Sequence, residues 1–258
     1  MDNPTNILQV DNLNVFYGKF QAVNNVSFHV SRGEIFGLLG PNGAGKTSTL
    51  SAVEGLIKQQ AGTVTVAGYD TLKNPLHARA AMGVQLQATS FQSELNVSEI
   101  LKLYASIYGA NLSKEKLQSL LSEINLADAE NKKFGQLSGG QQQRVSLAIT
   151  TIHDPKLVLL DEPTSGLDPQ SRRQLWTRIE AIREKGNGVV LTTHSMEEAE
   201  SVCDRISIID HGRVIATGTP QSLIDEHRNA PEVIAVSRRG RITLEDVFIA
   251  LTGTAVRA

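Results

Sequence analysis

The sequence predicts an α/β fold with a mostly parallel central sheet, an antiparallel β portion at the N-terminus and a helical subdomain. Three observations lead to this prediction. Short β-branched runs open the chain, apolar strands then recur with helical patterns between most of them, and the strand pattern is missing over about residues 88–150. Strands that alternate with helices form parallel sheets, because each helix carries the chain back to start the next strand at the same edge.

The first predicted element is the antiparallel β portion. Its two runs, around Ile7–Phe16 and Val23–Val30, are rich in β-branched residues and are separated by the turn Tyr17-Gly-Lys-Phe20. Two such runs joined by a short turn that contains glycine are typical of antiparallel pairing.

A buried strand follows in Glu34-Ile-Phe-Gly-Leu-Leu39, and a helical pattern runs from Lys46 to about Ile57. Between them the chain reads Gly40-Pro-Asn-Gly-Ala-Gly-Lys-Thr47, which fits the pattern G-x-x-x-x-G-K-[ST]. Glycines let successive backbone N–H groups surround phosphates, and the helix N-terminus adds partial positive charge. The sequence therefore predicts a P-loop NTPase in which Lys46 reaches the β- and γ-phosphates and Thr47 holds Mg²⁺. The residues predicted to bind the nucleotide here are Gly40, Pro41, Asn42, Gly43, Ala44, Gly45, Lys46, Thr47 and Ser48.

The helical subdomain is expected from apolar residues at helical spacing in three segments, 97–108, 114–124 and 141–153. Ser113 and Ser138 stand where N-caps are expected. The second of these caps belongs to Leu137-Ser-Gly-Gly-Gln141, a possible second anion site with a hydroxyl, bare N–H groups and a helix N-terminus. Taken alone it is only a good N-cap. The residues leave open whether this segment folds onto the first phosphate loop or serves another molecule.

Two predicted strands end in candidate metal-binding or catalytic side chains. The apolar run Leu157-Val-Leu-Leu160 predicts a strand buried on both faces, and it ends in Asp161 and Glu162, at the edge where open α/β sheets bind ligands. Asp161 is placed to hold Mg²⁺ through its water shell, and Glu162 to act as general base toward the attacking water. His194 ends the next strand, 189–193, where it is placed to bond the γ-phosphate and the attacking water. A last apolar strand is expected over 206–209.

Composition narrows the class of protein. The chain has 258 residues and a net charge of −2, which gives no basic field for nucleic acid or anionic lipid. Its single cysteine, Cys203, excludes an internal disulfide and fits a reducing compartment. No run of eighteen apolar residues occurs, and residues 1–5 lack the features of a signal peptide. We therefore expect a soluble, cytoplasmic protein.

These motifs, in this order and spacing, closely resemble the ATP-binding subunit of ABC transporters over about residues 5–225. The segments that carry the resemblance are Gly40-Pro-Asn-Gly-Ala-Gly-Lys-Thr47, Leu137-Ser-Gly-Gly-Gln141, Leu159-Leu-Asp-Glu-Pro163, Ser165-Gly-Leu-Asp168 and His194. The resemblance implies an ATP-binding domain over 1–225, with its helical subdomain at about 88–150, and a short tail over 226–258 with one helix. It also implies a head-to-tail dimer, in which ATP lies between the phosphate loop of one subunit and the second anion site of the other.

The resemblance implies further site residues. Tyr17 matches the aromatic residue that stacks on adenine, and Asp168 the residue that couples the two sites across the dimer. Gln87 matches the glutamine that senses Mg²⁺ and the attacking water, with Gln85 as a nearby competitor. The nucleotide contacts made across the dimer would come from Ser138, Gly139, Gly140 and Gln141. The surface between Gln87 and about Tyr108 would receive a coupling helix from a membrane-spanning partner, through a groove formed by some of Phe91, Leu95, Val97, Leu103, Tyr104 and Tyr108, most of which we expect to be core.

The predicted function is that of an ATPase subunit that powers export of a drug, antibiotic, lipid or polysaccharide through a separate permease. Val84-Gln-Leu-Gln87, 213–220 and 244–253 resemble the exporter branch, although many relatives carry a longer segment before 244. The alternatives are a non-transport ABC ATPase that acts on DNA or ribosomes, and an importer subunit. The acidic balance does not favour nucleic acid. The sequence decides neither the cargo nor whether the dimer forms from identical chains.

Overall fold

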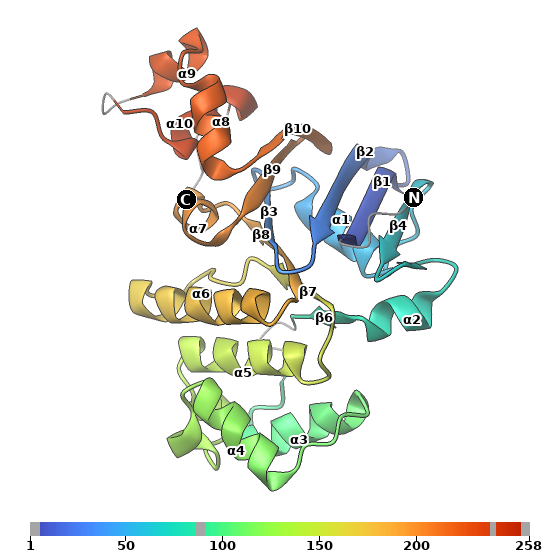
Figure 1. Ribbon diagram of the computed structural model, residues 1–258, viewed down its shortest axis with the longest axis vertical. Helices are drawn as coiled ribbons and strands as arrows, with labels where there is room; N and C mark the ends of the chain where they lie inside the picture. The colour runs from blue at the N-terminus through green and yellow to red at the C-terminus, as the bar shows by residue number, and fades with distance from the viewer. Residues whose placement is uncertain (1–5, 86–90, 238–240, 254–258) are drawn as a thin grey trace.

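The computed structural model describes residues 6–85, 91–237 and 241–253. Two sheets organise the chain (Figure 1). The first is antiparallel, with strand order β2-β1-β4-β5. Its strands are β1 (Asn6–Tyr17), β2 (Phe20–Ser31), β4 (Ala61–Val66) and β5 (Tyr69–Asp70). The long first pair confirms the predicted antiparallel β portion, and β4 and β5 extend it with strands that the sequence pattern did not show.

The second sheet is the central one, with order β10-β9-β3-β8-β7-β6. Its strands are β3 (Ile35–Leu39), β6 (Met82–Val84), β7 (Leu157–Asp161), β8 (Gly188–Thr193), β9 (Arg205–Asp210) and β10 (Arg213–Gly218). All neighbours pair in parallel except β10, which turns back antiparallel to β9. The mostly parallel sheet is thereby confirmed; β6, with three residues, is too short to produce a periodic pattern.

Each face of the central sheet has its own core, because successive strand residues point to opposite faces. Phe36 and Leu38 of β3 pack toward the antiparallel sheet, together with α1 (Lys46–Val53) and α2 (Pro75–Ala80). Ile35 and Leu39 pack on the opposite face, against α6 (Pro169–Glu184), α7 (Met196–Val202) and the C-terminal helices. The phosphate-loop helix α1 is therefore held between the two sheets.

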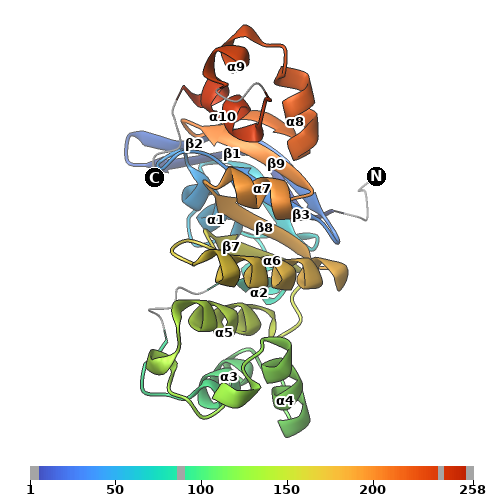
Figure 2. The same cartoon turned by 90° about the vertical axis from the view of Figure 1, so that its left-hand side faces the viewer.

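The helical subdomain lies beyond the β7–β6 edge of the central sheet (Figures 1 and 2). It contains α3 (Val97–Ile107), α4 (Lys114–Glu123), the 3₁₀ turns η2 (Ala127–Ala129) and η3 (Phe134–Gln136), and α5 (Gly139–Thr151). It has a third apolar core, in which Val97, Leu101 and Leu121 are fully buried. In both views α5 runs alongside α6, so α5 joins this lobe to the sheet.

Two sequence expectations need correction. The helix expected to reach about Ile57 ends at Val53, because Gly55 (φ +66°) takes the left-handed conformation that stops a helix. Of the tail predicted over 226–258 with one helix, the described residues 226–237 and 241–253 form two helices after the end of α8 (Pro220–His227), namely α9 (Pro231–Val236) and α10 (Leu244–Thr252). With six residues, α9 is shorter than two turns and shows no readable periodicity. Within the described ranges, no helix has the length and apolar character needed to cross a membrane.

Candidate nucleotide site

Strand order brings the predicted site residues to one edge. Strand β8 lies between β3 and β7, with Thr193 opposite Leu39 and Thr192 opposite Asp161. Parallel strands end at the same edge, so the loop after β3, the carboxylates after β7 and the histidine after β8 become neighbours. Residues more than a hundred positions apart in sequence thus form one site.

The phosphate loop closes over its own lysine. Lys46 is buried, with 6% of its surface exposed, and its Nζ donates to the carbonyl oxygens of Gly40 at 2.8 Å and Pro41 at 3.2 Å. The same Nζ lies 4.0 Å from Oε1 of Glu162. Burial lowers the pKa of Lys46, and the carboxylates of Glu162 and Asp161 oppose that shift. The Lys46 ammonium group is thus buried inside the loop, between the loop carbonyls and the Glu162 carboxylate.

Two glycines shape the loop. Gly45 has φ +105°, and a Cβ on it would lie 2.5 Å from the carbonyl oxygen of Ala22, so no side chain fits between the loop and β2. Gly43 has φ +82°, and a Cβ there would meet nothing within 4 Å. The loop is therefore packed on its protein side and open on the other, with backbone N–H groups at a helix start. This shape fits a phosphate group.

Oxygen ligands gather beside the loop. The Thr47 hydroxyl donates to Oδ2 of Asp161 at 3.3 Å, and the Thr192 hydroxyl donates to Oδ1 of the same carboxylate at 2.5 Å. A hydroxyl and a carboxylate at an exposed edge are the oxygen donors that Mg²⁺ takes, with its remaining positions filled by water and phosphate. The residues present fit this ion.

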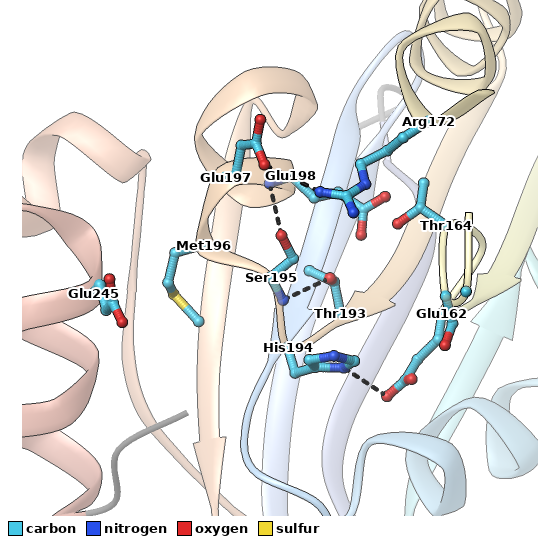
Figure 3. A pocket seen from close by; sticks show the side chains of 12 residues that line it. Glu162, Thr164, Arg172, Thr193, His194, Ser195, Met196, Glu197, Glu198 and Glu245 are labelled. Carbon is cyan, nitrogen blue, oxygen red and sulfur yellow. Dashed lines mark hydrogen bonds and ion pairs between the residues drawn. The ribbon is translucent and has the colours of Figure 1, made fainter. Parts of the chain in front are cut away.

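Glu162 and His194 face each other across the site (Figure 3). Nδ1 of His194 lies 3.3 Å from Oε1 of Glu162. Glu162 has φ +46°, unusual for a residue with a side chain, and its backbone N–H donates to the hydroxyl of Thr192 at 3.0 Å and to that residue's carbonyl at 3.2 Å. Backbone strain of this kind is held by its surroundings and gathers at functional sites. Here it turns the Glu162 side chain off the end of β7 toward the histidine.

A cavity of about 380 Å³ opens beside this pair. Its walls come from the turn after β7, the start of α6, the end of β8 and α7, with one residue from α10 (Figure 3). The lining residues are Glu162, Thr164, Ser165, Gly166, Arg172, Thr193, His194, Ser195, Met196, Glu197, Glu198 and Glu245. Reacting groups placed between Glu162 and His194 would thus have open space next to them.

Sequence reasoning missed Glu54, the residue that follows α1. Burial raises the pKa of its carboxyl to about 7, and the negative charge of Asp161 adds to the shift. No motif covers this position. Only the fold shows that the far end of the phosphate-loop helix turns an acid toward the strand end that carries Asp161.

The proposed adenine contact lies at the edge of the site. The Tyr17 hydroxyl is 3.4 Å from the Ser48 hydroxyl, and half of the tyrosine, 50%, remains exposed. Gln87 lies outside the described residues. Its competitor Gln85 directly follows β6; its backbone N–H donates to the carbonyl of Leu159 at 3.0 Å, and its buried Oε1 has no hydrogen-bond partner in the described part of the chain.

The second anion segment starts α5, in the helical subdomain. Oγ of Ser138 accepts from the backbone N–H of Gln141 at 3.3 Å, while Oε1 of Gln141 accepts from the N–H of Ser138 at 2.9 Å, a capping box. A Cβ on Gly140 would lie 2.5 Å from Oγ of Ser171, whose hydroxyl donates to Asp168 at 2.6 Å. That hydrogen bond is the first cause of the lowered pKa of Asp168. Ser138, Gly140 and Asp168 therefore lie close together.

A second link, also missed from the sequence, joins α5 to the loop that follows Glu162. Nε2 of Gln143 donates to the carbonyl of Pro163 at 2.6 Å, one residue beyond Glu162. The described hydrogen bonds include none between Ser138 and the phosphate loop. Within the described residues, α5 is thus connected to the loop after Glu162, while Ser138 at its start forms no hydrogen bond with the phosphate loop.

A glycine-rich loop between β3 and α1, with carboxylates at the adjacent strand ends, defines the chain as a P-loop nucleotide-binding ATPase. A family profile described as "ABC transporter" matches residues 23–165. The chain is 41% identical over 211 residues to the Nod factor export ATP-binding protein I of Burkholderia orbicola, which covers 81% of this chain and 69% of that protein. It belongs to the ATP-binding subunits of ABC transporters and is an ATP hydrolase.

A second relative is the linearmycin resistance ATP-binding protein LnrL of Bacillus subtilis, 38% identical over 84% of this chain and 70% of that protein. Among solved structures, an ATP-binding subunit of an ABC transporter superimposes with a TM-score of 0.81 at 30% identity, covering 95% of this chain and 99% of the other. A nucleotide-free ATP-binding cassette gives 0.79 at 24% identity, with 90% and 100% covered, which supports the fold alone.

Proposed function

We propose that this chain powers export through a separate membrane-spanning permease. The observation that carries the proposal is the meeting of Lys46, Asp161, Glu162 and His194 at one sheet edge, beside an open phosphate loop. ATP hydrolysis at such a site performs transport only when it is coupled to a conformational change in a second protein, here the proposed permease. The names of the relatives, Nod factor export and linearmycin resistance, favour export over import, with a drug, antibiotic, lipid or polysaccharide as the proposed cargo.

In the proposed reaction Glu162 is the general base. It accepts the proton of the water that attacks the γ-phosphate, while His194, 3.3 Å away, orients that water and the transferred phosphate. The Nζ of Lys46 exchanges its two carbonyl partners for the β- and γ-phosphates and stabilises the charge that develops on them. Tyr17 supports the adenine ring by stacking.

Magnesium would be held by Thr47 and, through water, by Asp161, with Gln87 as the third proposed contact. When bound, the ion would neutralise charge on the β- and γ-phosphate oxygens. The hydrogen bond from Thr192 fixes the orientation of the Asp161 carboxylate, so that its second oxygen stays directed toward Thr47.

The proposed functional unit is a head-to-tail dimer of two ATPase subunits, identical or different. Ser138, Gly139, Gly140 and Gln141 of one subunit would face the phosphates bound by the other. Two features support this arrangement. The start of α5 carries the polar groups for such a contact. The Gly140–Ser171–Asp168 and Gln143–Pro163 contacts would couple a movement of α5 to the loop that follows Glu162.

The permease would dock on α3 and hold the ATPase at the inner face of the membrane. Leu103 and Ile107 of this helix and Tyr108, which follows it, leave 43%, 65% and 38% of their surfaces exposed, whereas Phe91 and Val97 are core, as expected for most of the apolar residues here. Exposed apolar side chains grouped on one helix end favour a protein contact over open solvent.

The test is purification of tagged Glu162→Gln protein from detergent-solubilised membranes with ATP and Mg²⁺, followed by mass spectrometry. A stoichiometric polytopic membrane protein, lost when Leu103 and Ile107 are both replaced by Asp, is the expected result. Recovery only from the soluble fraction, with nucleic acid or ribosomal proteins attached, would contradict the transporter function.

A further inference from the structure

The most exposed aromatic residue of the described chain stands beside the proposed adenine contact. Phe20 leaves 66% of its surface in solvent, more than Tyr17 at 50%. Five of the seven phenylalanines lie in the cores with less than a tenth of their surface exposed: Phe28, Phe36, Phe91, Phe134 and Phe248. Core packing therefore does not account for Phe20.

Strand pairing fixes where the Phe20 ring lies. Tyr17 and Phe20 are directly paired at the end of the β1–β2 hairpin, and the two-residue turn between them begins with Gly18 at φ +61°. Directly opposed residues of an antiparallel pair carry their side chains on the same face, with Cβ atoms about 4.5–5.5 Å apart. The Phe20 side chain therefore leaves the hairpin on the same face as Tyr17, from the adjacent strand.

That face looks toward the phosphate loop. Tyr17 contacts Ser48 at the start of α1, and two residues beyond Phe20 the carbonyl of Ala22 lies against Gly45. Phe16, the preceding residue on β1, points to the opposite face of the strand, and its backbone N–H donates to Gln60 at 2.8 Å. The hairpin thus presents two aromatic rings to the nucleotide side and one to the other side.

We propose that Phe20 is a second aromatic contact for the nucleotide base, placed beside Tyr17 by their cross-strand pairing. This inference rests on the nucleotide site proposed above. Tyr17 supplies the stacking surface, and Phe20 covers the base from the neighbouring strand and removes apolar ring surface from water as it does so. Neither ring supplies a donor or acceptor pattern that reads a base edge, so the pair favours large ring systems over small ones without selecting adenine over guanine.

The test is calorimetric titration of the full chain with ADP and Mg²⁺, and separately with pyrophosphate, which fills the phosphate loop but has no base. Phe20→Ala is expected to weaken ADP binding about five- to tenfold, near the lower end of base–aromatic stacking effects, and to leave pyrophosphate binding unchanged. Phe20→Trp should restore ADP affinity, whereas Phe20→Leu should not. Phe16→Ala, the matched control on the other face, should change ADP affinity by less than twofold.

Tyr17→Ala separates this inference from the nucleotide site on which it rests. If Tyr17→Ala weakens ADP binding and Phe20→Ala does not, Phe20 is no base contact and the nucleotide site stands. If neither variant weakens it, the base lies elsewhere and both assignments are wrong. An equal loss of pyrophosphate affinity in Phe20→Ala would show that the ring only supports the loop, which also overturns the inference.

Discussion

Two glycine-containing helix starts in this molecule are built in opposite ways. At α1 the N-cap is Gly45 in a left-handed conformation with no side-chain cap, so the first N–H groups of the helix have no side-chain acceptor. At α5 the N-cap is Ser138, which forms a full capping box with Gln141. An uncapped start leaves its first N–H groups to water or a ligand, whereas a capping box satisfies two backbone N–H groups within the chain. The difference fits the proposed roles, with phosphate binding at the start of α1 and a contact with the partner subunit at the start of α5.

The residues around the two helix starts differ as well. Asp161, Glu162 and His194 surround the start of α1, where chemistry is possible. The start of α5 packs through Gly140 against Ser171, and the carboxylate behind that serine, Asp168, caps α6. We propose that hydrolysis takes place beside the start of α1, and that the start of α5 transmits the state of that site to the dimer contact. Four experiments test this division.

The largest effect is expected from Glu162→Gln. The amide keeps the shape of the side chain but cannot accept a proton, so ATP turnover should fall by about two orders of magnitude or more while ATP still binds. Steady-state phosphate release and ATP binding are the measurements. The control is Glu245→Gln, which removes the same charge from the wall of the same cavity. Undiminished turnover would show that Glu162 is not the base.

Ser138→Arg should abolish ATP-induced dimerisation and leave nucleotide binding by the single chain intact, since it places bulk and charge at the start of α5. Light scattering in the Glu162→Gln background with ATP and Mg²⁺ is the measurement. Ser113→Arg is a matched control, because Oγ of Ser113 accepts the backbone N–H of Lys116 at the start of α4, outside the proposed interface. A persistent ATP dimer in the Ser138 variant would place the contact elsewhere.

Glu54→Gln tests the buried acid behind the phosphate site. A carboxyl whose pKa rises from 4.5 in the unfolded chain to about 7 in the folded one favours folding below pH 4.5, and that contribution is lost as pH rises through 7. Glutamine carries no charge at any pH. The variant should therefore match the wild type at about pH 4 and exceed its free energy of unfolding by about 1–2 kcal/mol at about pH 8, after discounting for partial exposure.

Urea unfolding at the two pH values is the measurement, with Glu226→Gln on the exposed face of α8 as control. A difference between Glu54→Gln and wild type that does not change with pH would mean that the Glu54 carboxyl is not the titrating group.

The smallest effect is expected from Gly140→Ala. Its Cβ would come within 2.5 Å of Oγ of Ser171, so that side chain must move, and the free energy of unfolding should fall by about 1 kcal/mol. Gly139→Ala has open space around its Cβ and should be neutral or slightly stabilising, because alanine favours the helix. Equal stability of the two variants would show that the contact between α5 and α6 is loose.

The sequence by itself determined the parts that depend on local chemistry. Strands β3, β7, β8 and β9 follow from short apolar runs, α3 and α4 from helical periodicity, and the caps Ser113 and Ser138 from residue type. Asp161, Glu162 and His194 stand at strand ends whose positions the pattern predicts, Lys46 opens the helix after the phosphate loop, and the structure brings the four together at one edge.

Only the tertiary structure decided what depends on neighbours distant in sequence. The strand order that inserts β8 between β3 and β7, the short strands β5 and β6, and the contact of Gly140 with Ser171 arise from packing between segments that are distant in sequence. The same holds for Glu54, whose pKa depends on burial and on Asp161, and for Phe20, whose position depends on pairing with Tyr17. A residue's type is local, but its burial, electrostatic field and cross-strand partner belong to the folded chain.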